Sequence, residues 1–373
     1  MIRIKHAAFW AIPMMLTAGY AGQARSDEHM VLVDTIDVGG PLGLGAFDIS
    51  FVDPTIGLYV LADRTNASID FFDASDNTFI GRVGGFKGVI LDPVTKAAVN
   101  SKSGPDGVVI IDHKEVWAGD GDSTLKVIDI ATFAVTDIIT IVDPNDGTVK
   151  LRVDEMAYDS ADHILAAANN ANTPPFVTMV NTDTHEILGQ IVFDGKNGTP
   201  NAIDTGIEQP QWSPKTGLFY VAVPQIGPKD PTLGGISVID PSTMTVIANY
   251  PVSNCSPGGL TLGPRHEAMI GCNSAFVIPP NTVATTQSIV MNLDNGDIVA
   301  NITQAGGNDQ VWYDNGTHHY YLSARNTLTA GKVTPIMATV DAKTNTFDGD
   351  VASEPENLSV ARWKRSAKCC FGV

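Results

Sequence analysis

The chain has 373 residues, of which 17% are charged, 35 are glycine and 22 are proline. This balance favours many short strands joined by tight turns over long helices. The formal net charge of -18 at pH 7 repels phosphate backbones and anionic lipids, so it argues against nucleic acid and membrane surfaces as partners and favours cationic ligands or metal ions.

The first 24 residues are predicted to be a cleaved secretory signal peptide. A basic start with Arg3 and Lys5 precedes an apolar stretch from Ala7 to Ala18 and small residues around Ala21 and Ala24, which is the order of a signal sequence. The alternative is a membrane anchor, but the apolar stretch is shorter than the roughly 20 residues that cross a bilayer. We therefore expect a periplasmic or secreted protein with no membrane span in its mature chain, and a net charge of about -20 because cleavage removes two basic residues and no acidic one.

A hairpin then recurs six times along the chain. Each copy has a β-rich strand that ends in Asp or Asn, a short polar turn and a second β-rich strand, as in Ile69–Asp73 followed by Thr78–Val83. An Asp or Asn at this place can accept backbone N–H groups two residues further on, which closes the turn. We therefore predict a structural rather than a catalytic role for these residues, which are Asp73, Asp129, Asn181, Asp240, Asn292 and Asp341.

Two more predicted strands precede each hairpin, as Phe47–Val52 and Leu58–Ala62 do in the first copy. Four strands at a repeat of about 50 residues are typical of one propeller blade. Six complete units fill residues 46–351, so the sequence predicts an all-β propeller domain over residues 30–361.

The ring is expected to close through a seventh, composite blade. Val31–Val38 is a strand-like segment before the first unit, and Glu356–Ala361 resembles the first strand of another unit. A seven-bladed propeller is therefore predicted, with six blades as the alternative. Residues 362–373 lack the alternation of the repeat and are predicted to form an irregular tail.

Four cysteines bear on the compartment and on stability. In an exported protein, thiols are usually paired. The residues between Cys255 and Cys272 read as strand, turn and strand, which returns the chain to its start, so a disulfide between these two is expected. Two unpaired buried thiols are the alternative. Cys369 and Cys370 are adjacent near the end of the chain.

Several strand phrases resemble those of YVTN-type β-propeller repeat proteins. They are Leu58–Asp63 and Leu218–Val223, each followed by a Val-Ile-Asp type of strand, and Cys255–Pro264 and Gly306–Tyr313 are similar to a secreted bacterial subgroup of unassigned activity. The resemblance implies the fold, whereas propellers of similar build serve as haem d1 domains, quinoprotein subunits, lactonases or binding platforms. The chain departs from the subgroup at Leu358–Ala361, where the resemblance implies a histidine, and this puts any site at that position in doubt.

Candidate ligand-binding residues are those that open the innermost strands, because these strands converge on the mouth of the central channel. By the repeat alignment they are Asp48, Asp106, Glu155, Gln209, Asp309 and Asn357. Arg325, after a second strand, could clamp a carboxylate ligand or pair with Asp309. Asp48, Glu155 and Asp309 could together hold Ca²⁺, which prefers several oxygen ligands. The alternative for the whole set is a solvated rim of turn-forming residues.

Two functions follow from these residues. The first is a monomeric binding scaffold that presents its channel mouth to a small molecule or a protein. The second is a metal-dependent, lactonase-like hydrolase or lyase that uses the acidic rim, so the sequence leaves open whether the protein is an enzyme. Sequence motifs for haem attachment, dinucleotide binding and a serine nucleophile elbow are absent.

Overall fold

The computed structural model describes residues 34–39, 42–203, 205–227, 230–278, 280–352, 360–363 and 368–371. The predicted signal peptide and Asn357 lie outside these residues. Within them, no helix has the length and apolar character needed to cross a membrane.

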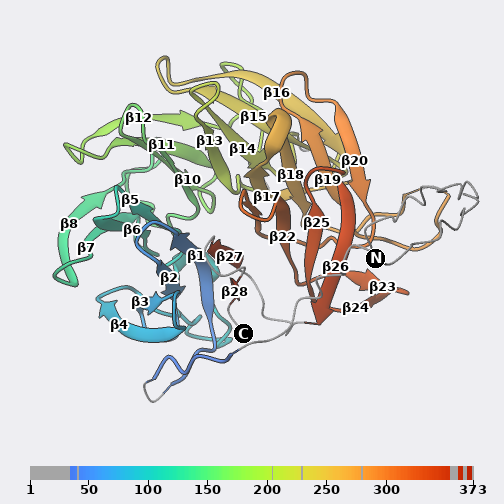
Figure 1. Ribbon diagram of the computed structural model, residues 1–373. Helices are drawn as coiled ribbons and strands as arrows, with labels where there is room; N and C mark the ends of the chain where they lie inside the picture. Colours follow the sequence, from blue (N-terminus) through green and yellow to red (C-terminus); the bar gives the residue numbers. More distant parts are fainter. Residues whose placement is uncertain are drawn as a thin grey trace, which may run out of the picture.

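Six four-stranded antiparallel sheets follow one another around a ring in chain order (Figure 1). Blade 1 comprises β1 (Phe47–Asp53), β2 (Leu58–Asp63), β3 (Ser68–Asp73) and β4 (Thr78–Gly84). Blade 2 comprises β5 (Val108–Ile111), β6 (Glu115–Gly119), β7 (Thr124–Asp129) and β8 (Ala134–Thr140). Blade 3 comprises β9 (Met156–Asp159), β10 (Ile164–Asn169), β11 (Phe176–Asn181) and β12 (Ile187–Val192). Blades 4 and 5 comprise β13 (Pro210–Ser213), β14 (Leu218–Val223), β15 (Leu233–Asp240) and β16 (Thr245–Ser253); and β17 (Pro257–Leu262), β18 (Glu267–Cys272), β19 (Ser288–Asn292) and β20 (Ile298–Ile302).

Blade 6 carries one insertion. Its strands are β21 (Val311–Asp314), β22 (His319–Ala324), β25 (Ile336–Asp341) and β26 (Thr346–Ala352), and a small hairpin of β23 (Leu328–Thr329) and β24 (Lys332–Val333) lies between β22 and β25 in the chain. Two short 3₁₀ turns, Asn100–Lys102 and Pro264–His266, lie between strands, the first between β4 and β5 and the second between β17 and β18. The predicted all-β propeller is confirmed, with six complete blades.

The repeated Asp or Asn residues close their turns as predicted. The carboxylate of Asp73 accepts the backbone N–H of Ser75 at 2.7 Å, and Asp240 accepts that of Ser242 at 2.9 Å. The side chain of Asn292 accepts the N–H of Asp294 in the same way, at 2.7 Å. Each of these residues ends the third strand of its blade.

The hydrophobic core lies between adjacent blades. Ile69 and Phe71 of β3 pack with Val108 and Val116 of blade 2 in one cluster of buried residues. Every residue of β2 is buried, because its side chains alternate between two faces that are both covered. Similar clusters join the following blades up to blade 6.

The predicted composite seventh blade is not confirmed, and the six-bladed alternative describes the structure. Among the described residues, a two-stranded sheet of β27 (Val360–Trp363) and β28 (Lys368–Phe371) stands between blade 6 and blade 1, where β27 contacts β1 and β21 (Figure 1). The segment predicted as the closing strand is not a strand where it is described, at residues 34–38. It lies instead against blade 1, where Val38 packs on Phe47 and Tyr59.

The segment predicted as an irregular tail, residues 362–373, contains β28. The prediction looked for the alternation of the four-stranded repeat. β28 does not belong to such a repeat, because it pairs with β27 as a local hairpin.

The predicted disulfide between Cys255 and Cys272 is confirmed. Cys255 lies two residues before β17, and Cys272 is the last residue of β18. Both cysteines are fully buried. Asn273, the next residue, reaches the channel mouth described below.

Candidate functional site

A cavity of about 220 Å³ lies at one mouth of the channel. The segments that open the innermost strands and those that follow the second strands meet here, because neighbouring strands of a blade are antiparallel. Its lining is strongly polar, with five acidic side chains, three arginines, three amide side chains and only one apolar residue, Ile49.

The repeat places one acidic residue at the opening of the inner strand in five of the six blades. The backbone N–H groups of Asp106, Asp154 and Glu208 donate to the second strands of their own blades, at Gly119, Ala168 and Ala222, over 2.8 to 3.0 Å. These three positions are therefore equivalent, and Asp48 and Asp309 stand at the corresponding place in blades 1 and 6. Of the five, Asp106 is not among the residues that line the cavity, whereas Glu155, next to Asp154, is. In blades 3 and 4 the repeat alignment made from the sequence selected the next residues, Glu155 and Gln209, and of these Glu155 lines the cavity.

Glycines allow the inner segments of neighbouring blades to approach each other at this mouth. A Cβ on Gly107 would lie 1.9 Å from the carbonyl oxygen of Asp154, and one on Gly259 would lie 2.9 Å from the backbone nitrogen of Val311. Any larger residue at these positions would push the blades apart.

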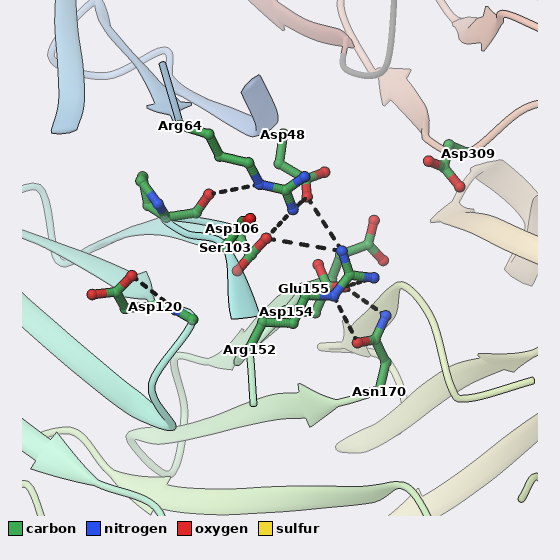
Figure 2. Close-up of polar contacts among 12 residues, drawn as sticks. Asp48, Arg64, Ser103, Asp106, Asp120, Arg152, Asp154, Glu155, Asn170 and Asp309 are labelled. Carbon is green, nitrogen blue, oxygen red and sulfur yellow. Dashed lines mark hydrogen bonds and ion pairs between the residues drawn. The ribbon is translucent and has the colours of Figure 1, made fainter. Parts of the chain in front are cut away.

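Arg64 and Arg152 lie among three of these carboxylates (Figure 2). The guanidinium of Arg64 forms ion pairs with both Asp48 and Asp106. Nη2 of Arg152 lies 2.9 Å from Asp154, and its Nη1 lies 3.8 Å from Asp48 and 3.9 Å from Asp106. The two arginines thus connect blades 1, 2 and 3.

The residues that follow the second strands hold the acidic residues in place. Nδ2 of Asn170 donates to Asp154 at 2.6 Å, and Nδ2 of Asn273 donates to Asp309 at 2.9 Å. Arg325 forms an ion pair with Asp309 at 3.0 Å, which is one of the two roles considered for it from the sequence. Asp48, Asp154 and Asp309 each therefore have a partner that directly follows the second strand of the same blade.

Glu155 and Gln310 connect opposite sides of the ring. Nε2 of Gln310 donates to Oε1 of Glu155 at 3.1 Å, and this bond joins blade 6 to blade 3. Glu155 is 5% exposed and Gln310 is 1% exposed. The second oxygen of Glu155, Oε2, and the side-chain oxygen of Gln310 are both buried without a hydrogen-bond partner.

Burial dominates the electrostatics of the cavity. It raises the pKa of Glu155 and of Glu208 well above the usual range, and the nearby carboxylates, Asp154 first among them, raise both further. Burial also raises the pKa of Asp154 to about 6, although Arg152 opposes this effect. Burial alone would lower the pKa of Arg152, but Asp154 and Asp106 outweigh it and keep the guanidinium charged.

Gln209 is not among the residues that line the cavity, where the sequence predicted it, and has a structural role instead. Its side-chain oxygen accepts the backbone N–H of Leu260 in β17 at 2.8 Å, and the residue is buried. This hydrogen bond connects blade 4 to blade 5.

The residues predicted to hold Ca²⁺ are interleaved with arginines. Asp48 pairs with Arg64 and Asp309 with Arg325, and Figure 2 shows Asp309 apart from Asp48 and Glu155. Over the described part of the chain, no group of three or more His, Cys, Asp or Glu side chains could hold a metal ion. The predicted calcium set is therefore not brought together as a ligand group there.

Sequence reasoning missed Arg64, Arg152, Asp154 and Glu208. Arg64 directly follows β2 as Arg325 directly follows β22, so an alignment of the repeats on the ends of the second strands finds it. Asp154 and Glu208 are found when the repeat alignment of blades 3 and 4 is moved by one residue. Arg152 lies in the segment between β8 and β9 and has no counterpart in the repeat that would reveal it.

Comparisons with known proteins give the fold alone. No protein-family model and no curated protein matches the sequence. The fold is similar to a solved structure of hydrazine synthase from Kuenenia stuttgartiensis, with a TM-score of 0.66 and 12% sequence identity, and the match covers 88% of this chain and 92% of that one.

Proposed function

We propose that the protein binds a small polar ligand in the cavity at the channel mouth and acts as a binding scaffold. One observation carries this proposal: the cavity is preformed, and ion pairs and hydrogen bonds from several blades hold its charged lining in place. Ligand sites in proteins are usually preformed concave pockets with a few convergent polar groups. The volume of about 220 Å³ favours a small molecule as the occupant over several side chains of a partner protein.

A panel of small probes tests the proposal without assuming the chemistry of the ligand. Thermal unfolding is followed with short amines, dicarboxylates, polyols and divalent cations. Binding of any class should raise the melting temperature, since a ligand that binds only the folded state stabilises it. Asn273→Phe, which fills the cavity from its lining, should abolish the shift, whereas Asn315→Phe on the exposed turn between β21 and β22 should not. If no class shifts the melting temperature, the proposal is wrong.

The alternative function is a metal-dependent hydrolase or lyase at the same acidic rim. Calorimetric titration with Ca²⁺ separates it from the scaffold. Saturable binding of Ca²⁺ that Asp309→Ala abolishes would favour the hydrolase, because the carboxylate would then be a metal ligand. The ion pairs of Asp48 and Asp309 with arginines lead us to expect no such binding.

We also propose that the protein is exported and is a distant relative of YVTN-type propellers. The disulfide between Cys255 and Cys272 supports export, because such bonds persist in oxidising compartments. The basic and apolar start of the chain supports it as well. N-terminal sequencing of the protein from cell fractions tests the proposal: a mature start near residue 22 or 25 is expected, and a cytoplasmic protein that keeps Met1 would contradict it.

A further inference from the structure

The charges that line the cavity do not balance. Five acidic side chains and three arginines line it, which leaves a surplus of two negative charges when all are ionised. A buried carboxylate without a counter-charge is costly. The lining as a whole therefore favours an occupant that carries positive charge.

Two buried oxygen atoms in the lining indicate which kind of cation fits. Oε2 of Glu155 and Oε1 of Gln310 have no hydrogen-bond partner, and both residues line the cavity while more than nine-tenths buried. The oxygen of Gln310 is an acceptor, and that of Glu155 is one when its carboxyl group is ionised, so each then needs a donor. The remaining hydrogen-bonding capacity of this pair requires N–H or O–H groups from the occupant.

The size of the cavity limits the occupant further. A volume of about 220 Å³ is below the roughly 300 Å³ at which pockets for drug-sized ligands begin. A linear molecule of a few carbon atoms with a charge at each end matches the volume and the double surplus of charge.

We propose that the cavity binds a short aliphatic diamine as its dication, with one ammonium group on Glu155 and Gln310 and the other toward Glu208. This inference rests on the proposed binding function and names the class of its ligand. Primary ammonium groups supply three donors each, so one group can satisfy both unpartnered oxygens. The carboxylate of Glu208, which also lines the cavity, supplies the second counter-charge.

Calorimetric titration of the full mature chain with 1,4-diaminobutane tests the inference against three matched probes. Butane-1,4-diol has the same length without charge, succinate has the opposite charge, and tetramethylammonium has a positive charge without N–H or O–H donors. We expect saturable binding of the diamine, weaker binding of tetramethylammonium, and none of the other two.

The outcomes separate the inference from the function on which it rests. If succinate or the diol binds in a manner lost in Asn273→Phe, and the diamine does not, the ligand class is wrong and the binding function stands. If none of the four probes binds, and the wider panel gives no shift, both are wrong.

Variants identify the residues. Glu155→Gln and Glu208→Gln should each weaken diamine binding by about tenfold or more, because each removes a close charge partner of the ligand. Glu186→Gln makes the same change at an exposed position in blade 3 and should leave binding unchanged. Glu208→Gln changes a half-buried residue and serves as the readout if Glu155→Gln does not fold. Full-strength binding by both folded variants would overturn the assignment.

A proton-linked readout is independent of the variants. Burial and the neighbouring carboxylates hold the pKa values of Glu155 and Glu208 well above their usual range in the empty cavity. Diamine binding favours their ionised forms, so the complex should release protons, and the diamine should bind more tightly as the pH rises through these raised pKa values. Titrations in buffers of different ionisation enthalpy measure the protons released, and binding that takes up protons would contradict the inference.

Discussion

Asp70 in β3 shows how a buried carboxylate depends on its neighbours. It is fully buried, accepts a hydrogen bond from the hydroxyl of Ser68 at 2.8 Å, and pairs with Arg82 at 3.1 Å. Burial and the nearby Asp63 raise its pKa to about 7, although Ser68 and Arg82 oppose them. The neutral form of Asp70 is therefore the one that the fold favours.

The raised pKa predicts the direction in which stability changes with pH. In the unfolded chain the carboxyl ionises near pH 4, whereas the folded state retains its proton to about pH 7. The stability that Asp70 contributes is thus complete at low pH and is lost as the pH rises toward and through 7. We expect the melting temperature of the wild type to fall between pH 5 and pH 8, by circular dichroism, and Asp70→Asn to reduce this fall.

The size of the effect follows from the shift, because each unit of raised pKa corresponds to about 1.4 kcal/mol. Asp162→Asn, at an exposed position, is the control and should keep the wild-type dependence on pH. If Asp70→Asn shows the same dependence as the wild type, Asp70 does not hold a proton in the folded state.

Single strands adapt to the channel mouth by changes in register. β1 shifts its pairing with β2 between Phe47 and Ser50, and β17 shifts its pairing with β18 between Pro257 and Leu260. Such irregularities redirect the side chains of an inner strand. In β1 the shift includes Asp48, which pairs with Arg64, and in β17 it includes Gly259, which lies against blade 6.

The disulfide stabilises the hairpin of β17 and β18, whose pairing contains the second of these register shifts. It closes a loop across 17 positions of the chain, from Cys255, two residues before β17, to the last residue of β18. We expect the double variant Cys255→Ala with Cys272→Ala to lose about 3 kcal/mol of unfolding free energy, because a loop of this length is constrained in the unfolded chain. Urea unfolding measures the loss. The wild type under strong reductant should show a loss in the same direction, and equal stability of oxidised and reduced wild type would contradict the prediction.

Closure of the ring is a property of the whole molecule. Adjacent blades bury their faces against each other, but blade 6 and blade 1 are joined through β27, which contacts both β1 and β21. Phe51 of β1 and Trp312 of β21 also meet directly, with ring centroids 5.7 Å apart. The ring therefore closes with less than a full blade at this point.

A shortened chain tests this closure. A chain that ends at Ala352 lacks β27 and β28, so the inner strands of blades 1 and 6 lose the element between them. Exposed apolar surface and strand edges at this point should lower the melting temperature by several degrees and favour aggregation. Thermal unfolding and light scattering measure both effects. A chain that ends at Phe371 is the control, and equal behaviour of the two would show that the terminal hairpin does not close the ring.

The sequence by itself determined the blades, because the interactions that define them are local. Asp73 and its five counterparts close turns with residues two or three positions away, and the apolar strands repeat at a regular interval, so both can be predicted from the order of residues. The disulfide could be predicted for the same reason, since a single hairpin joins its cysteines.

Only the tertiary structure decided the composition of the cavity and the number of blades. Glu155 meets Gln310 across 155 positions of the chain, and Arg64 reaches Asp106 across 42, contacts that exist only once the ring has closed. Alignment of the repeats was uncertain by one residue, and in a strand one residue changes the face to which a side chain points. The number of blades depended on whether the chain ends paired with each other, and β27 pairs with β28 instead.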